Sequence, residues 1–199
     1  MSFIPLHVYT GYSFLQSGIN EENYLKALKK RGFKGSGITD FNSLSGVPHF
    51  YKALKQEKLN LLAGVDFLID DNLLSFFALN EEGYRNLLKL LFIKRTGNLT
   101  YEEVGRHKAG LAVVLAIAHS KLSSLFETER DQIPHFLLPI SNLGEHFYLG
   151  IEFGVEEDEL FVAYMRDFAR THGYQTVAFP FIRYIDKKDA IVLEIAKAI

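Results

Sequence analysis

The chain has 199 residues, of which 48% are hydrophobic, with 17 Phe, no Cys and a formal net charge of −2 at pH 7. This length suits one domain that buries a substantial core. Without Cys, the chain can form neither a disulfide framework nor a thiolate metal site, which fits a reducing cytoplasm. The near-neutral charge argues against a free-standing DNA-binding module. No apolar run is long enough for a membrane span or signal peptide.

The first 46 residues predict a strand, a helix and a second strand. The strands fall over residues 6–9 and 37–39, and the helix over 20–31 begins at the capping residue Asn20 and ends at Gly32. Polar residues follow each strand directly. Because ligands of parallel α/β folds bind at the carboxyl ends of strands, we expect a functional site at these polar loops.

The remaining sequence alternates between helical and extended patterns. Helices are predicted over residues 47–58, 80–91, 100–103 onward, 120–142 with proline interruptions, 156–171 and from Asp186 to the end, and strands over 61–69, 73–79, 110–118, 147–153 and 175–181. Leu88 and Leu160 are expected on buried helix faces. About seven strands interleaved with helices predict a closed, mostly parallel barrel, and a doubly wound open sheet is the alternative.

Three motifs carry a resemblance to a known family. They read LHVYTGYSFL at residues 6–15, ITDFNSLSG at 38–46 and NEEGYRNLLKL at 80–90. These strings resemble those of PHP (polymerase and histidinol phosphatase) domains, in particular the domain at the N-terminus of bacterial DNA polymerase III alpha subunits. The resemblance implies a distorted (β/α)7 TIM-like barrel and a single PHP domain over residues 1–199. Because the last helix reaches Ile199 with no stop signal, we expect an N-terminal fragment of a much longer polymerase chain.

In metal-binding PHP domains, His and acidic residues at the barrel mouth hold metal ions that activate water against a phosphoester. The resemblance places the corresponding vestigial site on His7, Tyr9, Gln16, Asp40, Phe41, Asp66, Leu73, Phe181 and Arg183. Only His7 and Asp66 keep side chains suited to a metal, and two ligands are too few for a catalytic zinc site. We therefore expect no catalytic residue, no metal and no cofactor in this domain.

The polar residues of this site each have a structural alternative, which we favour. His7 is expected to be a hydrogen-bonded core histidine rather than a metal ligand, and Asp40 to cap its own loop rather than act as a base. A buried Asp66 needs a partner, and Arg183 or a backbone donor suits it better than a metal. His119, after the aliphatic strand, is expected to face solvent rather than replace a lost ligand.

One hypothesis concerns what replaces the metal ions. Unpaired buried carboxylates are costly, so we expect Arg183 to pair with Asp66 or Asp40. Phe41 and Phe181 would then form an aromatic plug, completed by the hydroxyl group of Tyr9.

Three functions stay open. The favoured one is a structural and interaction domain, inactive as a hydrolase, of a replicative DNA-directed DNA polymerase. Its partners would be the other domains of the same chain, a proofreading exonuclease subunit and, through the parent polymerase, DNA, without a membrane. A residual metal-dependent phosphoesterase or pyrophosphatase is the second possibility. A stand-alone phosphatase, such as histidinol-phosphate phosphatase, is the third, and the lost ligands argue against it.

Overall fold

The computed structural model describes residues 3–152 and 159–197. The chain divides into two compact units, Met1–Asp66 with Phe181–Ile199 and Phe67–Pro180. Strand β2 (Asn60–Ile69) carries the chain out of the first unit into the second. The expectation that residues 1–199 form one PHP domain stays a prediction.

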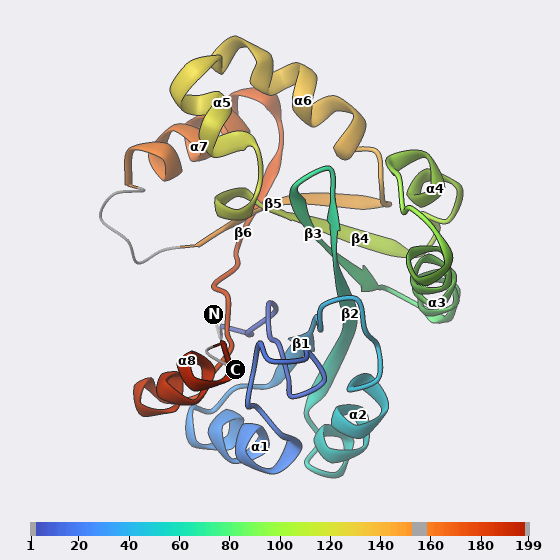
Figure 1. Ribbon diagram of the computed structural model, residues 1–199, viewed down its shortest axis with the longest axis vertical. Helices are drawn as coiled ribbons and strands as arrows, with labels where there is room; N and C mark the ends of the chain where they lie inside the picture. Colours follow the sequence, from blue (N-terminus) through green and yellow to red (C-terminus); the bar gives the residue numbers. More distant parts are fainter. Residues whose placement is uncertain (1–2, 153–158, 198–199) are drawn as a thin grey trace. The chain divides into compact units, whose positions relative to one another are not determined.

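In its described residues, the first unit combines helices with a pair of parallel strands (Figure 1). Its elements are α1 (Glu21–Lys30), β1 (Gly35–Ile38), α2 (Val47–Gln56), the first part of β2, η4 (Lys187–Asp189) and α8 (Ala190–Lys197). β1 and β2 pair in a parallel register from Gly35 opposite Asn60 to Ile38 opposite Ala63. The predicted cap of α1 is confirmed, because the Asn20 side chain accepts a hydrogen bond from the backbone of Asn23.

The segment of residues 5–9 is extended, but the strand predicted over 6–9 is wrong. Among the described residues, this segment forms a single β-bridge, between Val8 and Ile182. The backbone of Gly37 in β1 donates a hydrogen bond to this segment at 2.7 Å. A Cβ atom on Gly37 would lie 2.4 Å from the carbonyl oxygen of Leu6. Glycine at this position therefore lets the segment lie directly against β1.

The second unit contains the end of β2 and further strands. These are β3 (Asn72–Ala78), β4 (Leu111–Ala116), β5 (His146–Ile151) and β6 (Gln175–Ala178). β3 and β4 are antiparallel, whereas β4, β5 and β6 are parallel to one another. Asp70 and Asp71, which connect β2 to β3, have φ angles of 49° and 63°. Both residues adopt the left-handed backbone conformation that is typical of tight hairpin turns. The predicted turn is therefore confirmed.

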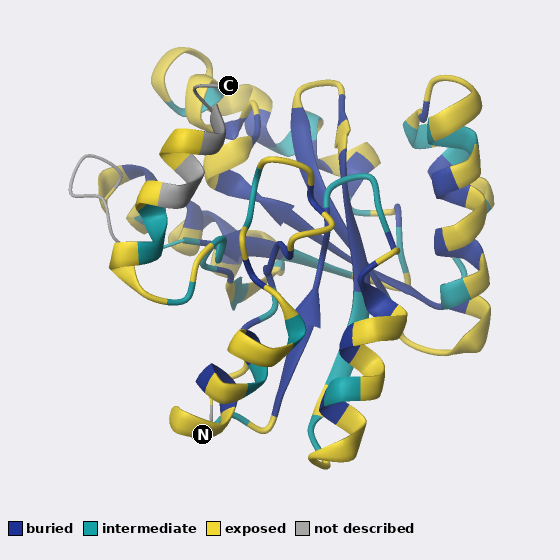
Figure 2. Cartoon of the chain, turned by 60° about the horizontal axis from the view of Figure 1, so that its bottom comes forward, coloured by how far each residue is buried: buried dark blue, intermediate teal, exposed yellow. Residues whose placement is uncertain are grey.

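Helices flank the strands of the second unit (Figure 1), and helical surfaces of the chain that face away from the strands are largely exposed (Figure 2). They are α3 (Glu81–Thr96), α4 (Tyr101–Arg106), η1 (Ile117–His119), α5 (Leu122–Thr128), η2 (Arg130–Gln132), α6 (Ile133–Ile140) and α7 (Glu159–His172). α3 packs against β3 and β4, and α7 packs against β6. The predicted interruption of residues 120–142 is confirmed. Pro134 falls in the first turn of α6, where its missing N–H costs nothing, and Pro139 lies one residue before the helix ends.

Two residues expected in the core lie at the surface. Leu88 is 48% exposed and Leu160 is 80% exposed. The buried face of α3 instead contains Leu87, Leu90 and Leu91. This face follows the helical spacing of three and four residues, which places Leu88 on the opposite side.

The chain is a mixed α/β fold. Within residues 3–152 and 159–197, six strands are present where about seven were expected, because residues 6–9 form only a bridge. A closed barrel is not seen in this part of the chain. Residue 153 of one predicted strand, residues 156–158 of a predicted helix, and Ile199 lie outside the described residues.

Candidate functional site

His7 and Asp66 form a buried pair in the first unit. The Nε2 atom of His7 lies 2.7 Å from Oδ2 of Asp66, and both residues are 0% exposed. Two backbone hydrogen bonds hold Asp66 in place. Its N–H donates to the carbonyl of Asp40, and its carbonyl accepts from the N–H of Asn42. His7 is therefore a buried, hydrogen-bonded histidine, as expected, and the expectation that it is not a metal ligand stays a prediction.

Aromatic rings enclose this pair. The rings of His7 and Phe181 are stacked with centroids 4.2 Å apart and an interplanar angle of 5°. Tyr9 meets Phe181 edge to face at 4.5 Å, and Phe41 lies 6.5 Å from Tyr9. The backbone of Phe41 also forms a parallel β-bridge with the backbone of Asp66. The structure thus brings together the residues that were expected to form an aromatic plug.

Asp40 lies in a cradle of hydrogen-bond donors. Its carboxylate accepts from the Thr10 N–H at 2.6 Å, from the Thr10 hydroxyl at 2.7 Å and from the Ser13 hydroxyl at 2.6 Å. A Cβ atom on Gly46 would lie 2.7 Å from Oδ2 of Asp40, so only glycine leaves room for this cradle. Asp40 therefore fixes the loop after residues 5–9 to the end of β1, as a structural cap does.

The buried acids and Tyr9 influence one another. Burial raises the pKa of Asp40, the hydrogen bonds from Ser13 and Thr10 offset part of that rise, and the charge of Asp66 adds to it. Burial is also the main reason why the pKa of Tyr9 lies well above its ordinary value. The charge of Asp66 and the hydrogen bond between Tyr9 and Asp66 raise it further. Tyr9 therefore stays a neutral donor toward Asp66.

The expected pairing of Arg183 with a carboxylate is wrong. Among the described residues, Arg183 has no ion pair with Asp66 or Asp40 within 4.0 Å, and Asp66 pairs with His7 instead. The guanidinium carbon of Arg183 lies 4.8 Å from the ring centre of Phe181, a cation–π contact. His7 reaches the carboxylate from the adjacent extended segment, so it takes the place that was expected for the arginine.

Other residues of the predicted site are placed as follows. Gln16 is half-buried in the loop of residues 10–19 of the first unit. Leu73 is buried in β3 of the second unit. His119 is also in the second unit, where its Nε2 lies 3.6 Å from a carboxylate oxygen of Glu152, at the ends of neighbouring parallel strands. The histidine is 43% exposed at its side chain, as expected for a strand end that faces solvent.

Sequence reasoning missed three hydroxyl residues that hold this site together. Thr10 and Ser13 supply donors to Asp40. Ser17 donates to the carbonyl of Tyr9 at 2.7 Å and lies 3.0 Å from the carbonyl of Arg183, which ties two distant segments together. Their signal in the sequence is weak, because Thr and Ser are common in any loop that follows a strand.

These residues do not fit a metal ion. The donor atoms of His7 and Asp66 face each other at hydrogen-bond distance, and the Asp40 oxygens already accept three hydrogen bonds. Within the described ranges of the chain, no group of three or more His, Cys, Asp or Glu side chains could hold an ion. In this part of the chain, His7 and Asp66 thus provide two ligand-type side chains, fewer than the three of a catalytic zinc site.

Comparison with known proteins defines the class to which this fold and site belong. The family model for the PHP domain matches residues 5–126, which is more than half of the chain. The chain belongs to the PHP domain family.

Its relatives include much longer proteins that are named DNA polymerase III subunit alpha. One from Streptococcus pyogenes serotype M3 is 33% identical over 117 residues, which cover 57% of this chain and 11% of the relative. Another from Borreliella burgdorferi is 25% identical over 220 residues, with 97% of this chain and 19% of the relative covered. The chain therefore spans about a tenth to a fifth of the length of these relatives.

Some solved structures share a similar fold with this chain at low sequence identity. An amidohydrolase from Chromobacterium violaceum, determined with sulfate and without metal, matches with a TM-score of 0.64 and 12% identity, covering 97% of this chain and 96% of that one. A two-domain protein from Bacteroides vulgatus, containing a predicted PHP-like metal-dependent phosphoesterase, matches with a TM-score of 0.59 and 10% identity, covering 94% of this chain and 53% of that one. At such identities the likeness concerns the fold alone. No helix in the described part of this chain has the length and apolar character to cross a bilayer.

Proposed function

We propose that this chain is the PHP domain of a DNA polymerase III alpha subunit and that it acts as a scaffold without hydrolase activity. The relatives in Streptococcus pyogenes and Borreliella burgdorferi support the parent protein. On this proposal, the strands of the domain belong to the distorted (β/α)7 barrel of the family, and residues 1–199 are one domain of a longer chain.

One observation carries the proposed inactivity. His7 and Asp66, which keep ligand-type side chains, are joined at 2.7 Å and covered by the stacked ring of Phe181. The Nε2 atom of His7 and Oδ2 of Asp66 are engaged with each other, and Phe181 and Phe41 lie directly beside the pair. In our account, Tyr9, Phe41, Phe181 and Arg183 convert a metal-binding mouth into a packed core.

The scaffold role implies partners. The other domains of the same polymerase chain are the first candidates, a proofreading exonuclease subunit is the second, and DNA is contacted through the parent polymerase. The nucleotidyl transfer itself would reside outside this chain.

Primer extension by the full polymerase tests the proposal. Tyr9→Phe removes the hydroxyl that hydrogen-bonds to Asp66, and Asp66→Asn removes the charge of the pair. A scaffold predicts normal extension by either variant once circular dichroism shows that it is folded. Phe50→Ala, which empties a fully buried site in the core, serves as the destabilised comparison. Loss of extension by a fully folded Asp66→Asn enzyme would contradict the scaffold role.

A residual metal-dependent phosphoesterase is the second candidate. The observation in its favour is that Asp40, Asp66 and His7 lie together, since Asp66 accepts from His7 and pairs through its backbone with Asp40. Phosphate release from pyrophosphate or a phosphomonoester, dependent on added Mn²⁺ or Zn²⁺, would favour this candidate over the scaffold.

A further inference from the structure

Two adjoining hollows open on the first unit, away from the His7–Asp66 pair. The larger has a volume of about 400 Å³ and the smaller about 230 Å³. They share a wall that is made of Ala27 and Arg31 from the α1 region and of Tyr184 and Ile185 from the C-terminal segment. The larger volume lies in the range of small-molecule sites.

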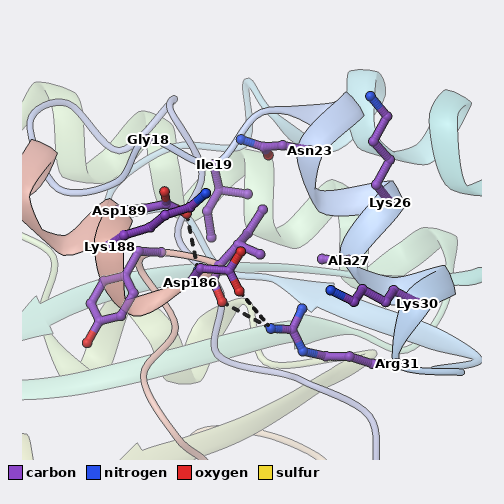
Figure 3. Close-up of a pocket in the computed structure, with 12 residues that line it drawn as sticks. Gly18, Ile19, Asn23, Lys26, Ala27, Lys30, Arg31, Asp186, Lys188 and Asp189 are labelled. Carbon is purple, nitrogen blue, oxygen red and sulfur yellow. Dashed lines mark hydrogen bonds and ion pairs between the residues drawn. The ribbon is translucent and has the colours of Figure 1, made fainter.

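The larger hollow is lined mainly by cations. Its charged lining residues are Lys26, Lys30, Arg31 and Lys188, with Asp186 and Asp189 as the carboxylates. Figure 3 shows Lys30 and Arg31 extending from α1 toward Asp186, whereas Lys26 points away from it. Because Lys26 is paired with Glu22, three cations stand against two carboxylates, which leaves the lining with a small excess of positive charge.

The two carboxylates are already engaged. Asp186 accepts from the guanidinium of Arg31 at 3.4 Å and from the backbone of Asp189, whose own carboxylate accepts from the Asp186 N–H at 3.2 Å. By contrast, Lys30 and Lys188 have no ion pair or hydrogen-bond acceptor for their ammonium groups within the described residues. The hollow therefore contains cations that are available to an anionic ligand.

The smaller hollow is apolar and aromatic. Its remaining lining residues are Phe3, Pro5, Tyr24, Leu28, Phe33 and Ile182. The rings of Phe3 and Phe33 meet edge to face at 5.7 Å. Tyr184, in the shared wall, lines both hollows and is 42% exposed. A ligand that fills both hollows would thus combine an anionic group with a flat, apolar one.

We propose that these hollows bind a nucleoside phosphate. The phosphate would lie at Lys30 and Lys188, because ammonium donors suit phosphate oxygens. Arg31 lies beside them, with its guanidinium held by Asp186 and by the carbonyl of Ile185. The base would lie against Tyr184 and the apolar hollow, since bases stack on aromatic side chains with little dependence on sequence. A free nucleotide and the terminal nucleotide of a single strand present the same chemistry. The lining residues would bind a nucleoside phosphate whether or not the chain is part of a polymerase.

The test is an NMR titration of the ¹⁵N-labelled 199-residue chain with dTMP, thymidine, inorganic phosphate and a 5′-phosphorylated (dT)4. We expect dTMP to shift the amide signals of residues 26–31 and 184–189 and to bind about tenfold or more tightly than either fragment. If the tetranucleotide binds more tightly than dTMP, the site is assigned to a strand end. If the two bind equally, it is assigned to a free nucleotide. No shift at about 10 mM dTMP, or shifts confined to other residues, would overturn the proposal.

Charge reversal separates this site from non-specific attraction. Lys30→Glu and Lys188→Glu should each weaken dTMP binding about tenfold or more, because each removes a charge-assisted hydrogen bond and adds a repulsive charge. Lys52→Glu, on the exposed side of α2 and outside both hollows, is the matched control and should leave binding unchanged. Equal losses in all three variants would contradict the site. So would equal displacement of dTMP by a glutamate-rich peptide, which would assign the hollow to a carboxylate-bearing partner.

The aromatic contact has its own control. Tyr184→Ala should weaken dTMP binding without changing the affinity for inorganic phosphate. Tyr51→Ala removes a tyrosine of similar exposure, 51%, from α2 and should change neither affinity. If Tyr184→Ala left dTMP binding intact, the base would not lie where we place it.

Discussion

The imidazole Nε2 of His7 lies 2.7 Å from the Asp66 carboxylate, in a position where neither side chain is exposed to solvent. The two residues belong to an extended segment and to β2, which are far apart in sequence and are brought together by the fold of the first unit. Because a buried carboxylate without a partner is costly, the contact with His7 stabilises Asp66 in the core of the first unit.

A double-mutant cycle tests the energetic importance of this pair. Asp66→Asn alone should lower the free energy of unfolding by about 1.5–3 kcal/mol, because it weakens a buried hydrogen bond to a carboxylate. His7→Leu combined with Asp66→Asn should lose less than the sum of the single losses, with a coupling of about 1 kcal/mol or more in urea melts.

A cycle on a neutral buried pair provides the control for this measurement. The hydroxyl oxygens of Tyr24 and Ser36 lie 2.7 Å apart in the same unit. Tyr24→Phe with Ser36→Ala should give a smaller coupling, because neither partner carries a charge. Additive losses for His7 and Asp66 would mean that the contact contributes nothing specific to stability.

The pH dependence of stability should reveal the ionisation of Asp40. Burial raises its folded-state pKa above the ordinary value of 3.8. The folded protein therefore binds more protons than the unfolded chain between those two pKa values. The contribution of Asp40 is fully present below pH 3.8 and is lost as the pH rises through the folded pKa.

Comparison with Asp40→Asn isolates this effect. Asparagine does not titrate, so the stability of the wild type relative to the variant should fall as the pH rises through that window. Urea melts from about pH 3 to 8 would measure the difference, since carboxylates titrate within this range. A difference that is constant, or that grows in favour of the wild type with rising pH, would contradict the raised pKa.

Leucines of α3 distinguish the buried face from the exposed one. Leu90→Ala should lower the free energy of unfolding by about 2–5 kcal/mol, because Leu90 is 0% exposed and its loss leaves a cavity. Leu88→Ala, a 48% exposed position two residues away, should cost well under about 1 kcal/mol. Thermal or urea unfolding of both variants provides the comparison. Similar losses at the two sites would mean that the face of α3 is assigned wrongly.

Local patterns in the sequence predict local structure well here. Asn20 predicts the start of α1 because its side chain caps the N–H of a residue only three positions away. Asp70 and Asp71 predict their turn because the turn likewise depends on neighbouring residues alone. Leu88 misleads because leucines occur at positions 87, 88, 90 and 91, so that more than one face of the helix reads as apolar.

The site is harder to predict because it depends on segments that are far apart in sequence. The family motifs indicate that His7, Tyr9, Phe41, Asp66 and Phe181 gather, and the structure places them together. The partner of Asp66 was predicted wrongly, since residue types alone do not say which cation reaches the carboxylate first. Hydrogen bonds from loop hydroxyl groups to Asp40 leave no pattern in sequence at all.

We propose that the His7–Asp66 region of this PHP domain is packed and does not hold a catalytic metal. The most direct test is elemental analysis of the 199-residue chain purified without chelator and after incubation with Mn²⁺ or Zn²⁺, with phosphate release from pyrophosphate and 4-nitrophenyl phosphate measured on the same samples. Our account predicts far less than one metal ion per chain and no phosphate release above background. One or more tightly bound ions per chain, with hydrolysis that is abolished in a folded Asp40→Asn variant, would contradict it.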